Sequence, residues 1–147
     1  MKTLELAKEY YSWMVDLRRD FHRHPEPSFK EYRTSKRIKE ELENMGLEVT
    51  TIGGTGVVGL LKGEKEGKVV ALRADIDALS VNEETGLEFS SEVPGMMHAC
   101  GHDFHAAMLL GAAKILSEMK SELNGSVKFI FQPAEEVAKG AKKMIEG

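Results

Sequence analysis

The stretch Phe104–Met119, FHAAMLLGAAKILSEM, decides the fold class because it is apolar almost all round. A helix with apolar residues on every side is buried, as it is when it packs against a sheet. Strand-like runs lie before and after it, at Lys68–Ala74 and Ser126–Gln132, and Val137–Ile145 has the pattern of a final helix. Strand, helix, strand and helix in this order predict a βαβα unit, and therefore an α/β layered domain.

Two helices are predicted before the first strand. Apolar residues recur at steps of three and four over residues 6–21, which predicts one helix that ends at His24-Pro25. Ser28 and Glu31 have the spacing of a capping box, so a second helix is expected to begin there and to end at Gly46. Its buried face would consist of Phe29, Tyr32, Ile38, Leu42 and Met45.

The middle of the chain predicts a hairpin. Leu47–Ile52 and Thr55–Lys62 have the composition of strands, and the turn Gly53-Gly54 joins them. A hairpin next to a βαβα unit gives a mixed sheet. The chain has no internal repeat, low-complexity tract or Pro-rich linker, and its 16.3 kDa is the size of one domain, so residues 1–147 are expected to form a single unit.

Composition narrows the class of partner. A net charge of -4 with 30% charged residues does not favour a nucleic-acid or anionic-membrane binder, so the expected partner is a small molecule. The first nine residues are charged where a signal peptide has an apolar core, and no stretch approaches about 20 apolar residues. With one reduced thiol, the chain is interpreted as cytoplasmic.

The loop before the apolar helix, Met97-His98-Ala99-Cys100-Gly101-His102-Asp103, places a thiol and an imidazole two residues apart. Both groups can bind a metal ion, and Cys100 is the only cysteine, so it has no disulfide partner within the chain. Acidic pairs follow the two strands of the βαβα unit: Asp75 and Asp77, then Glu135 and Glu136. Because ligands bind beyond the carboxyl ends of strands in open α/β sheets, these groups are expected to share one crevice.

These residue types suit metal-assisted chemistry. Thiolate, neutral imidazole and carboxylate are all zinc ligands, and a catalytic zinc keeps one position open for water. Of two adjacent glutamates, one can hold the metal while the other reaches the metal-bound water as general base. The aspartates could orient ligands or help to neutralise the cation.

Each residue also has a structural interpretation. Cys100 could be a small core hydrophobe, Asp103 the N-cap of its helix, and the glutamate pair a favourable charge at a helix N-terminus. Asp75 and Asp77 could be turn residues. His105 fits a helix surface, and His22 and His24 are interpreted as structural. The metal interpretation is favoured because the groups occur together at one predicted edge.

Three motifs occur in order: Ala71-Leu72-Arg73-Ala74-Asp75-Ile76-Asp77-Ala78-Leu79, the Met97–Asp103 loop with His105, and Phe131-Gln132-Pro133-Ala134-Glu135-Glu136 with Gly140-Ala141-Lys142-Lys143-Met144-Ile145. Together they resemble the amidohydrolase branch of the dinuclear metallopeptidases, which includes hippurate hydrolase, the thermostable carboxypeptidase/aminoacylases and the indoleacetyl-amino-acid hydrolases. The similarity runs from the first helix to the last residue. It implies a three-layer α/β/α metallopeptidase-type catalytic domain with a mixed sheet.

Carried over position by position, the resemblance implies three metal ligands: Cys100, His102 and Glu136. It implies Glu135 as the general base, and Asp75 as a second catalytic candidate that acts from behind the ligands. Other branches have a metal-binding histidine where this chain has Arg73, and the Cys-x-His pair would compensate for it. Three further residues are expected beside the ligands: Asp77, Asp103 and His105.

The implied reaction is hydrolysis of an N-acyl amino acid or of a carboxy-terminal peptide bond. A water held between two divalent metal ions would lose its proton to Glu135 and attack the carbonyl, and Glu135 would then pass the proton to the leaving amine. Soft sulfur favours zinc, although manganese, cobalt and nickel also bind such mixed sites. The expected cofactor is therefore two ions in a complete site, with a small N-acyl amino acid or peptide as substrate.

The resemblance breaks where the chain stops. Family members are more than twice as long and carry two further histidine ligands and a lid domain that dimerises, so this chain resembles the amino-terminal part of a catalytic domain without its lid. It supplies three of five expected ligands. One alternative is therefore an inactive fragment or assembly partner, a homo-oligomer or complementing chain held by an unpaired sheet edge. Another is a thiol enzyme with Cys100 as nucleophile.

Overall fold

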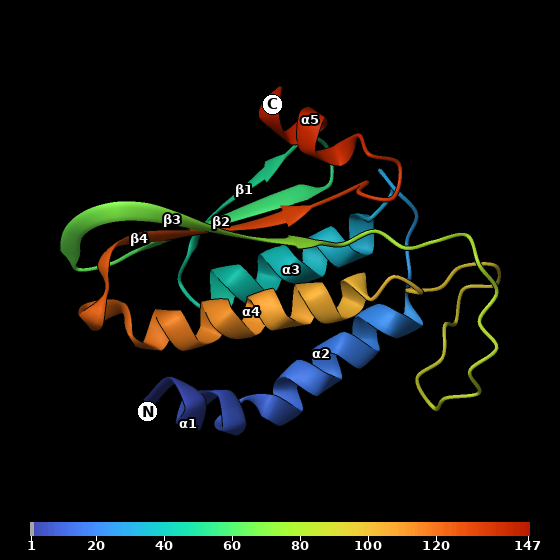
Figure 1. The fold of residues 1–147 in the computed structure, drawn as a ribbon, viewed down its shortest axis with the longest axis horizontal. Helices are drawn as coiled ribbons and strands as arrows, with labels where there is room; N and C mark the ends of the chain where they lie inside the picture. The colour runs from blue at the N-terminus through green and yellow to red at the C-terminus, as the bar shows by residue number, and fades with distance from the viewer. Residues whose placement is uncertain (1) are drawn as a thin grey trace.

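The computed structural model describes residues 2–147. In chain order the elements are α1 Lys2–Glu9, α2 Tyr11–Arg23, α3 Tyr32–Asn44, β1 Glu48–Ile52, β2 Gly56–Lys62, β3 Lys65–Asp75, α4 His102–Glu118, the short helix η1 Lys120–Glu122, β4 Asn124–Gln132 and α5 Gly140–Ile145. The long segment between β3 and α4 is a loop, which extends to one side of the molecule (Figure 1).

The four strands form one mixed sheet in the order β1-β2-β4-β3. β1 and β2 are an antiparallel hairpin, with Glu48 opposite Leu60, and β2 also pairs antiparallel with β4. β3 and β4 are parallel, and Asp75 lies opposite Gln132 at their carboxyl ends. α4 connects these two strands, so the predicted βαβ unit, the hairpin and the mixed sheet are all confirmed.

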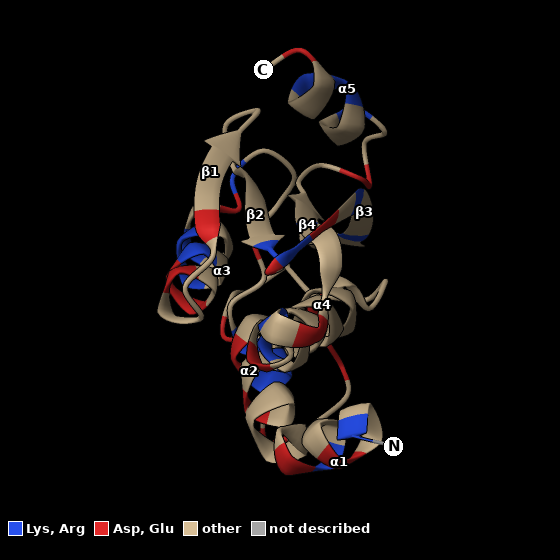
Figure 2. Cartoon of the chain, turned by 90° about the vertical axis from the view of Figure 1, so that its left-hand side faces the viewer, with Lys and Arg blue, Asp and Glu red and all other residues tan. Residues whose placement is uncertain are grey.

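Helices lie on both faces of the sheet. α3 and α4 cover one face, α2 packs on the outer side of α4, and α5 lies over one end of the other face (Figures 1 and 2). The core between the sheet and its helices is built from fully buried aromatic and aliphatic side chains: Leu17, Phe21, Ile38, Leu42, Leu110, Phe129 and Phe131. Burying each such side chain stabilises the fold by about 1.5–3 kcal/mol.

The first predicted helix is two helices. α1 and α2 are separated at Tyr10, where the backbone has φ -86° and ψ 3°. The hydrogen-bond pattern continues across the break, because the Tyr10 N–H donates to the Leu6 carbonyl and the Met14 N–H donates to Tyr10. Only α2 buries residues in the core, among them Leu17 and Phe21, so the break turns the exposed α1 aside without disturbing packing.

The predicted capping box at the start of α3 is wrong. Ser28 and Glu31 make contacts elsewhere, and neither caps the helix among the described residues. The first free amides of α3 instead donate to the Glu26 carboxylate, from Arg33 at 3.0 Å and from Thr34 at 2.8 Å. The last helix is likewise shorter than predicted, because residues 135–138 form a turn before α5.

Several apolar side chains are more exposed than predicted. Tyr32, the first residue of α3, is 67% exposed. Val69 and Val70 of β3 are 61% and 55% exposed, since β3 is an edge strand. On α4, Phe104 and Met108 face outward too. The sequence therefore predicts the strands and the crossover helix correctly, but it misses the break between α1 and α2 and overstates the burial of β3 and α4.

Candidate metal centre

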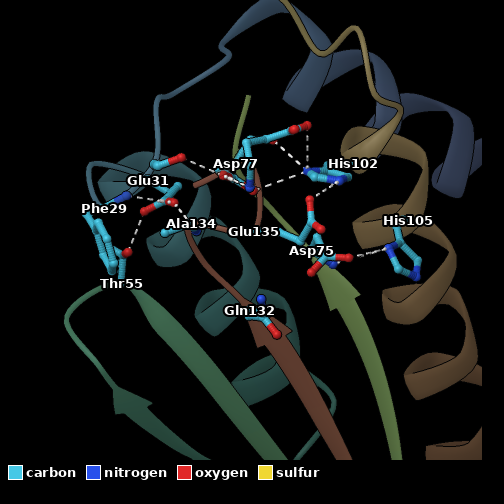
Figure 3. A network of polar contacts seen from close by, with 12 residues as sticks. Phe29, Glu31, Thr55, Asp75, Asp77, His102, His105, Gln132, Ala134 and Glu135 are labelled. Atoms are coloured by element: carbon cyan, nitrogen blue, oxygen red, sulfur yellow. Dashed lines mark hydrogen bonds and ion pairs between the residues drawn. The ribbon is translucent and has the colours of Figure 1, made fainter. Parts of the chain in front are cut away.

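The carboxyl ends of β3 and β4 and the amino end of α4 meet at one edge of the sheet (Figure 3). β3 ends at Asp75, β4 ends at Gln132, and α4 begins at His102. Parallel strands direct their carboxyl ends to the same side, and the helix that connects them returns to that side. The polar groups that follow the strands are thereby brought beside the Cys-Gly-His loop.

Cys100, His102 and Glu136 come together at this edge. One potential ligand atom from each, a sulfur, a ring nitrogen and a carboxylate oxygen, lies within 4.8 Å of the others. His102 is 6% exposed, while the Cys100 side chain is open to solvent. Glu136 Oε1 is buried without a hydrogen-bond partner among the described residues. A buried carboxylate oxygen that makes no hydrogen bond, lies 3.9 Å from His102 Nδ1 and has a thiol beside it fits a divalent cation, because a buried charge requires close partners.

Asp77 fixes the orientation of the His102 ring. The ring Nδ1 lies 2.9 Å from the Asp77 carbonyl oxygen, to which it donates, and 3.2 Å from Oδ1 of the same residue. This leaves Nε2 for a metal, and a ligand histidine commonly donates its other N–H in this way. The hydrogen bond to Asp77 raises the pKa of His102 to about 9, against the effect of burial. A metal ion must therefore displace a proton from this ring.

Asp77 also joins His102 to the neighbouring segments. Its carboxylate is completely buried, and Oδ2 accepts from the Ser28 hydroxyl at 2.7 Å and from the Glu136 N–H at 3.1 Å. Burial acts to raise the pKa of Asp77, but hydrogen bonds from His102 and Ser28 hold it below its ordinary value. One ionised carboxylate thus connects the His102 ring to the backbone of Glu136.

Gly101 separates the thiol from the imidazole. Its φ of +82° lies in the left-handed region, which favours glycine, and it stands at the N-cap position of α4. This turn lets Cys100 precede the helix while His102 is already in its first turn. Desolvation and the neighbouring Glu136 carboxylate raise the pKa of the Cys100 thiol. A raised pKa disfavours a free nucleophilic thiolate, whereas a coordinated cation favours the deprotonated form.

Asp75 is held between two side chains, those of Arg73 and His105. Arg73 donates to Asp75 Oδ1 at 2.5 Å and, through Nε, to the Gln132 side chain at 2.7 Å. On the other side, His105 Nδ1 accepts the Asp75 N–H at 3.2 Å and lies 3.3 Å from Asp75 Oδ2. Arg73 therefore occupies the position of the expected histidine with an ion pair to Asp75, and His105 contacts Asp75 rather than the three clustered groups.

Glu135 is the more open of the two glutamates. Its side chain is 43% exposed, and Oε2 lies 3.7 Å from Nε2 of His102. The Glu136 side chain is only 17% exposed, and Oε1 lies 3.9 Å from Nδ1 of His102. The two carboxylates therefore occupy different environments, one able to exchange protons with solvent and one inside the cluster.

Asp103 lies outside this cluster. The structural interpretation predicted Asp103 as the N-cap of α4, and this is wrong. Asp103 is buried in the first turn of the helix, with Oδ2 2.7 Å from His22 Nδ1 and 2.8 Å from Arg18 Nε. His22 is buried as well, and its Nε2 lies 3.2 Å from Glu83 Oε1. The structural interpretation of His22 thus agrees with its contacts.

Three further residues at this edge carry no recognisable sequence signal. Ser28 binds Asp77, and Glu31 accepts the N–H of Ala134, although their spacing pointed to a helix cap. His98 is 4% exposed with both ring nitrogens unpaired among residues 2–147, and burial lowers its pKa to about 4. The contacts of Ser28 and Glu31 join segments that are distant in sequence.

The sequence profile of Peptidase family M20/M25/M40 matches residues 71–147, slightly more than half of the chain. The chain therefore belongs to this family, and the predicted resemblance to the dinuclear metallopeptidases is confirmed. A solved structure described as the Bacillus subtilis YXEP protein, a dinuclear metal binding peptidase from the M20 family, matches with a TM-score of 0.90 and 48% identity, over 95% of this chain and 39% of that one. Human carnosine dipeptidase 1, at 13% identity and a TM-score of 0.75, covers 99% of this chain and 36% of its own and shares the fold.

Curated relatives match over nearly the whole chain. The N-acetylcysteine deacetylase of Bacillus subtilis (strain 168) is 49% identical over 95% of this chain and 37% of its own length. Thermostable carboxypeptidase 1 of Saccharolobus solfataricus is 53% identical over 95% of this chain and 37% of its own. The IAA-amino acid hydrolase ILR1-like 4 of Arabidopsis thaliana is 51% identical over 99% of this chain and 33% of its own. The chain thus spans about a third of the length of these relatives.

The matched family is a peptidase family, and the solved Bacillus subtilis protein is described as a dinuclear metal binding member of it. Within the described residues, no helix combines the length and the hydropathy that a membrane span requires.

Proposed function

We propose that the polypeptide to which this chain belongs is a metal-dependent amidohydrolase that cleaves N-acyl amino acids or carboxy-terminal peptide bonds. The observation that carries the proposal is the cluster of Cys100, His102 and Glu136, with potential ligand atoms within 4.8 Å of one another and a buried Glu136 oxygen that makes no hydrogen bond among the described residues. Sulfur, nitrogen and oxygen donors that meet at one point are typical of a metal-binding site.

The three clustered residues would hold the metal, each through a different donor atom. His102 would coordinate through Nε2, because its Nδ1 is bonded to Asp77. Sulfur makes the donor set soft, which favours zinc, while manganese, cobalt and nickel also suit mixed donors. When bound, a divalent ion lowers the pKa of water and polarises a carbonyl group. Coordination by Cys100 requires a reduced thiol, which is consistent with a cytoplasmic location.

Glu135 is proposed as the general base. Its exposed carboxylate beside His102 can accept the proton of an attacking water and pass it to the leaving amine. Asp75 would act through its neighbours: its ion pair with Arg73 and its contacts with His105 hold the carboxyl end of β3 in place beside the ligands. The charged side chains at this edge are thus held in fixed positions before substrate binds, which is the basis of electrostatic preorganisation.

The substrate class rests on the relatives. A deacetylase of N-acetylcysteine, a carboxypeptidase and an indoleacetyl-amino acid hydrolase share a substrate chemistry, in which an amide joins an acyl group to an amino acid. We therefore propose this amide as the bond that is cleaved. Three ligands form only part of a two-ion site, so this chain by itself is expected to bind metal weakly and to turn over little substrate.

Zinc titration of the purified, metal-free chain tests the proposal. We expect saturable zinc binding that Cys100→Ser and Glu136→Gln each weaken, while His24→Asn, a histidine outside the cluster, leaves it unchanged. Equal zinc binding by the Cys100→Ser variant and the wild-type chain would contradict the ligand set. An assay with an N-acetyl amino acid accompanies the titration, and rapid turnover with stoichiometric zinc would contradict the view that the site is incomplete.

The exposed edge of β3 favours a second candidate, an assembly partner that pairs with a complementing chain or with a second copy. Val69 and Val70 lie on a long edge strand and are more than half exposed, and unpaired edges of this kind promote association. Sedimentation analysis of the purified chain tests pairing with a second copy, because a stable monomer at all concentrations would exclude self-association through this edge. The raised pKa of Cys100 makes the thiol-enzyme alternative the weakest of the three.

A further inference from the structure

Glu31 carries a carboxylate in the interior, with the residue 0% exposed. It accepts three hydrogen bonds: one from the Thr55 hydroxyl to Oε2, one from the Phe29 N–H to Oε1 at 3.0 Å, and one from the Ala134 N–H to the same Oε1 at 2.9 Å (Figure 3). The carboxylate thereby joins the segment before α3, the turn between β1 and β2, and the segment after β4. These are distant parts of the chain.

The two backbone donors share an unusual conformation. Phe29 has φ +63° and Ala134 has φ +50°, both in the left-handed region that residues with a Cβ rarely adopt. A residue persists in this conformation only where its surroundings hold it. Here a single carboxylate oxygen accepts the N–H of both residues, so Glu31 compensates both strained positions at once.

Ala134 directly precedes the glutamate pair. Its carbonyl accepts the N–H groups of Lys139 at 3.3 Å and Gly140 at 3.1 Å, which close the turn that carries Glu135 and Glu136. Gly140 allows this closure, because a Cβ there would lie 1.5 Å from the Pro133 carbonyl oxygen. The turn is therefore anchored at its start by the hydrogen bond from Ala134 to Glu31.

The same short segment reaches the other side of the cluster. Ser28 donates to Asp77, and Asp77 orients His102 and accepts the Glu136 N–H. Residues 28–31 thus contact both the histidine side and the glutamate side of the candidate metal centre. Neither Ser28 nor Glu31 reaches the clustered ligand atoms itself.

We propose that Glu31 is a positioning residue for the metal centre: its buried carboxylate holds Ala134, and through it the turn of Glu135 and Glu136, at the distance from Cys100 and His102 that metal binding requires. The proposal rests on the proposed function. This role is additional to the proposed function, because it makes the geometry of the glutamate turn depend on a residue more than one hundred positions earlier in the chain.

Two measurements on the whole chain test this role. The first is amide hydrogen exchange of Ala134 in the metal-free protein, and the second is zinc affinity. Glu31→Ala should raise the exchange rate of the Ala134 amide on the order of tenfold, because it loses its acceptor. It should weaken zinc binding roughly tenfold, as expected when a residue behind the ligands is lost. Glu31→Gln retains an oxygen acceptor of lower charge and should show smaller changes in the same direction.

Glu26→Ala is the matched control. Glu26 also accepts two backbone N–H groups, at the start of α3, but makes no hydrogen bond to the glutamate turn. It should lower thermal stability and leave the Ala134 amide and the zinc affinity unchanged when variants are compared at equal fractions of folded protein. Glu31→Gln keeps the test decisive if Glu31→Ala does not fold.

Two outcomes separate the failure of this inference from that of the proposed function. If the Glu31 variants match the Glu26 variant in Ala134 exchange and in zinc affinity, the positioning role is overturned. If the wild-type chain binds no zinc at all, the proposed function fails, and the Ala134 amide alone decides whether Glu31 holds the turn.

Discussion

Two adjacent residues of α4, His102 and Asp103, each belong to a buried histidine–aspartate pair, yet the two pairs differ in what they can bind. In the His22–Asp103 pair both ring nitrogens face carboxylate oxygens, at 2.7 Å for Asp103 and 3.2 Å for Glu83. In the His102–Asp77 pair only Nδ1 is engaged, and Nε2 lies 3.7 Å from Glu135. A histidine can serve as a metal ligand only where one nitrogen is left open, so the second partner decides the role.

The largest expected effect is on stability, in the His22–Asp103 pair. Asp103→Ala removes a buried charge that both His22 and Arg18 contact, and we expect the free energy of unfolding to fall by about 3–5 kcal/mol. Urea denaturation measures this change. Asp16→Ala, at an exposed position of α2, should stay within about 0.5 kcal/mol of the wild type. A small loss of stability in Asp103→Ala would contradict the view that the His22–Asp103 pair serves mainly to stabilise the fold.

The next effect is on metal affinity, in the His102–Asp77 pair. His102→Ala removes a proposed ligand, and we expect zinc affinity to fall at least about 100-fold, beyond the range for residues behind the ligands. His22→Ala should retain the affinity of the wild type in the fraction that is folded. Isothermal titration with zinc compares them, and equal losses in the two variants would remove the distinction between the pairs.

A smaller effect is expected from Asp77, which orients the His102 ring. Asp77→Asn keeps the shape but removes the charge beside His102, so zinc affinity should fall roughly tenfold. The pKa of His102 should also fall from about 9 toward its ordinary value of 6.5, because the hydrogen bond to Asp77 is the main cause of the shift. Proton NMR of the metal-free chain follows this titration. Asp103→Asn is the comparison, and it should leave the pKa of His102 in place.

The smallest effect concerns pH and the partner of His22. Burial acts to raise the pKa of Glu83, but hydrogen bonds from Thr85 and the Ser91 N–H lower it to about 2, from an ordinary 4.5. A lowered folded-state pKa contributes stability above pH 4.5 that is lost as the pH falls toward 2.

Wild-type protein should accordingly lose more unfolding free energy between pH 4.5 and pH 2 than Glu83→Gln does. Denaturation curves at several pH values in this window measure the difference. Parallel losses in the two proteins would show that Glu83 contributes nothing to the acid sensitivity.

Much of the fold could be predicted because its signals are local. The apolar run around Leu110 predicted the crossover helix, and the Gly53-Gly54 turn predicted the hairpin. The exposure of Val69 and Val70 could not be predicted, because an apolar strand has the same pattern at the centre of a sheet and at its edge. The predicted capping box was wrong because the Glu26 carboxylate accepts the first amides of α3, while the Glu31 carboxylate accepts an N–H in the interior.

The sequence by itself determined the family, the elements and a set of residues able to bind a metal, because residue type and short-range spacing are written in the chain. Only the tertiary structure decided how these residues are used. In the folded chain Glu31 is hydrogen-bonded to Ala134 and Ser28 to Asp77. Both ring nitrogens of His22 contact carboxylate oxygens at 3.2 Å or less, whereas Nε2 of His102 makes no hydrogen bond to a described residue. These are contacts between distant segments, whose distances and burial arise only when the chain has packed.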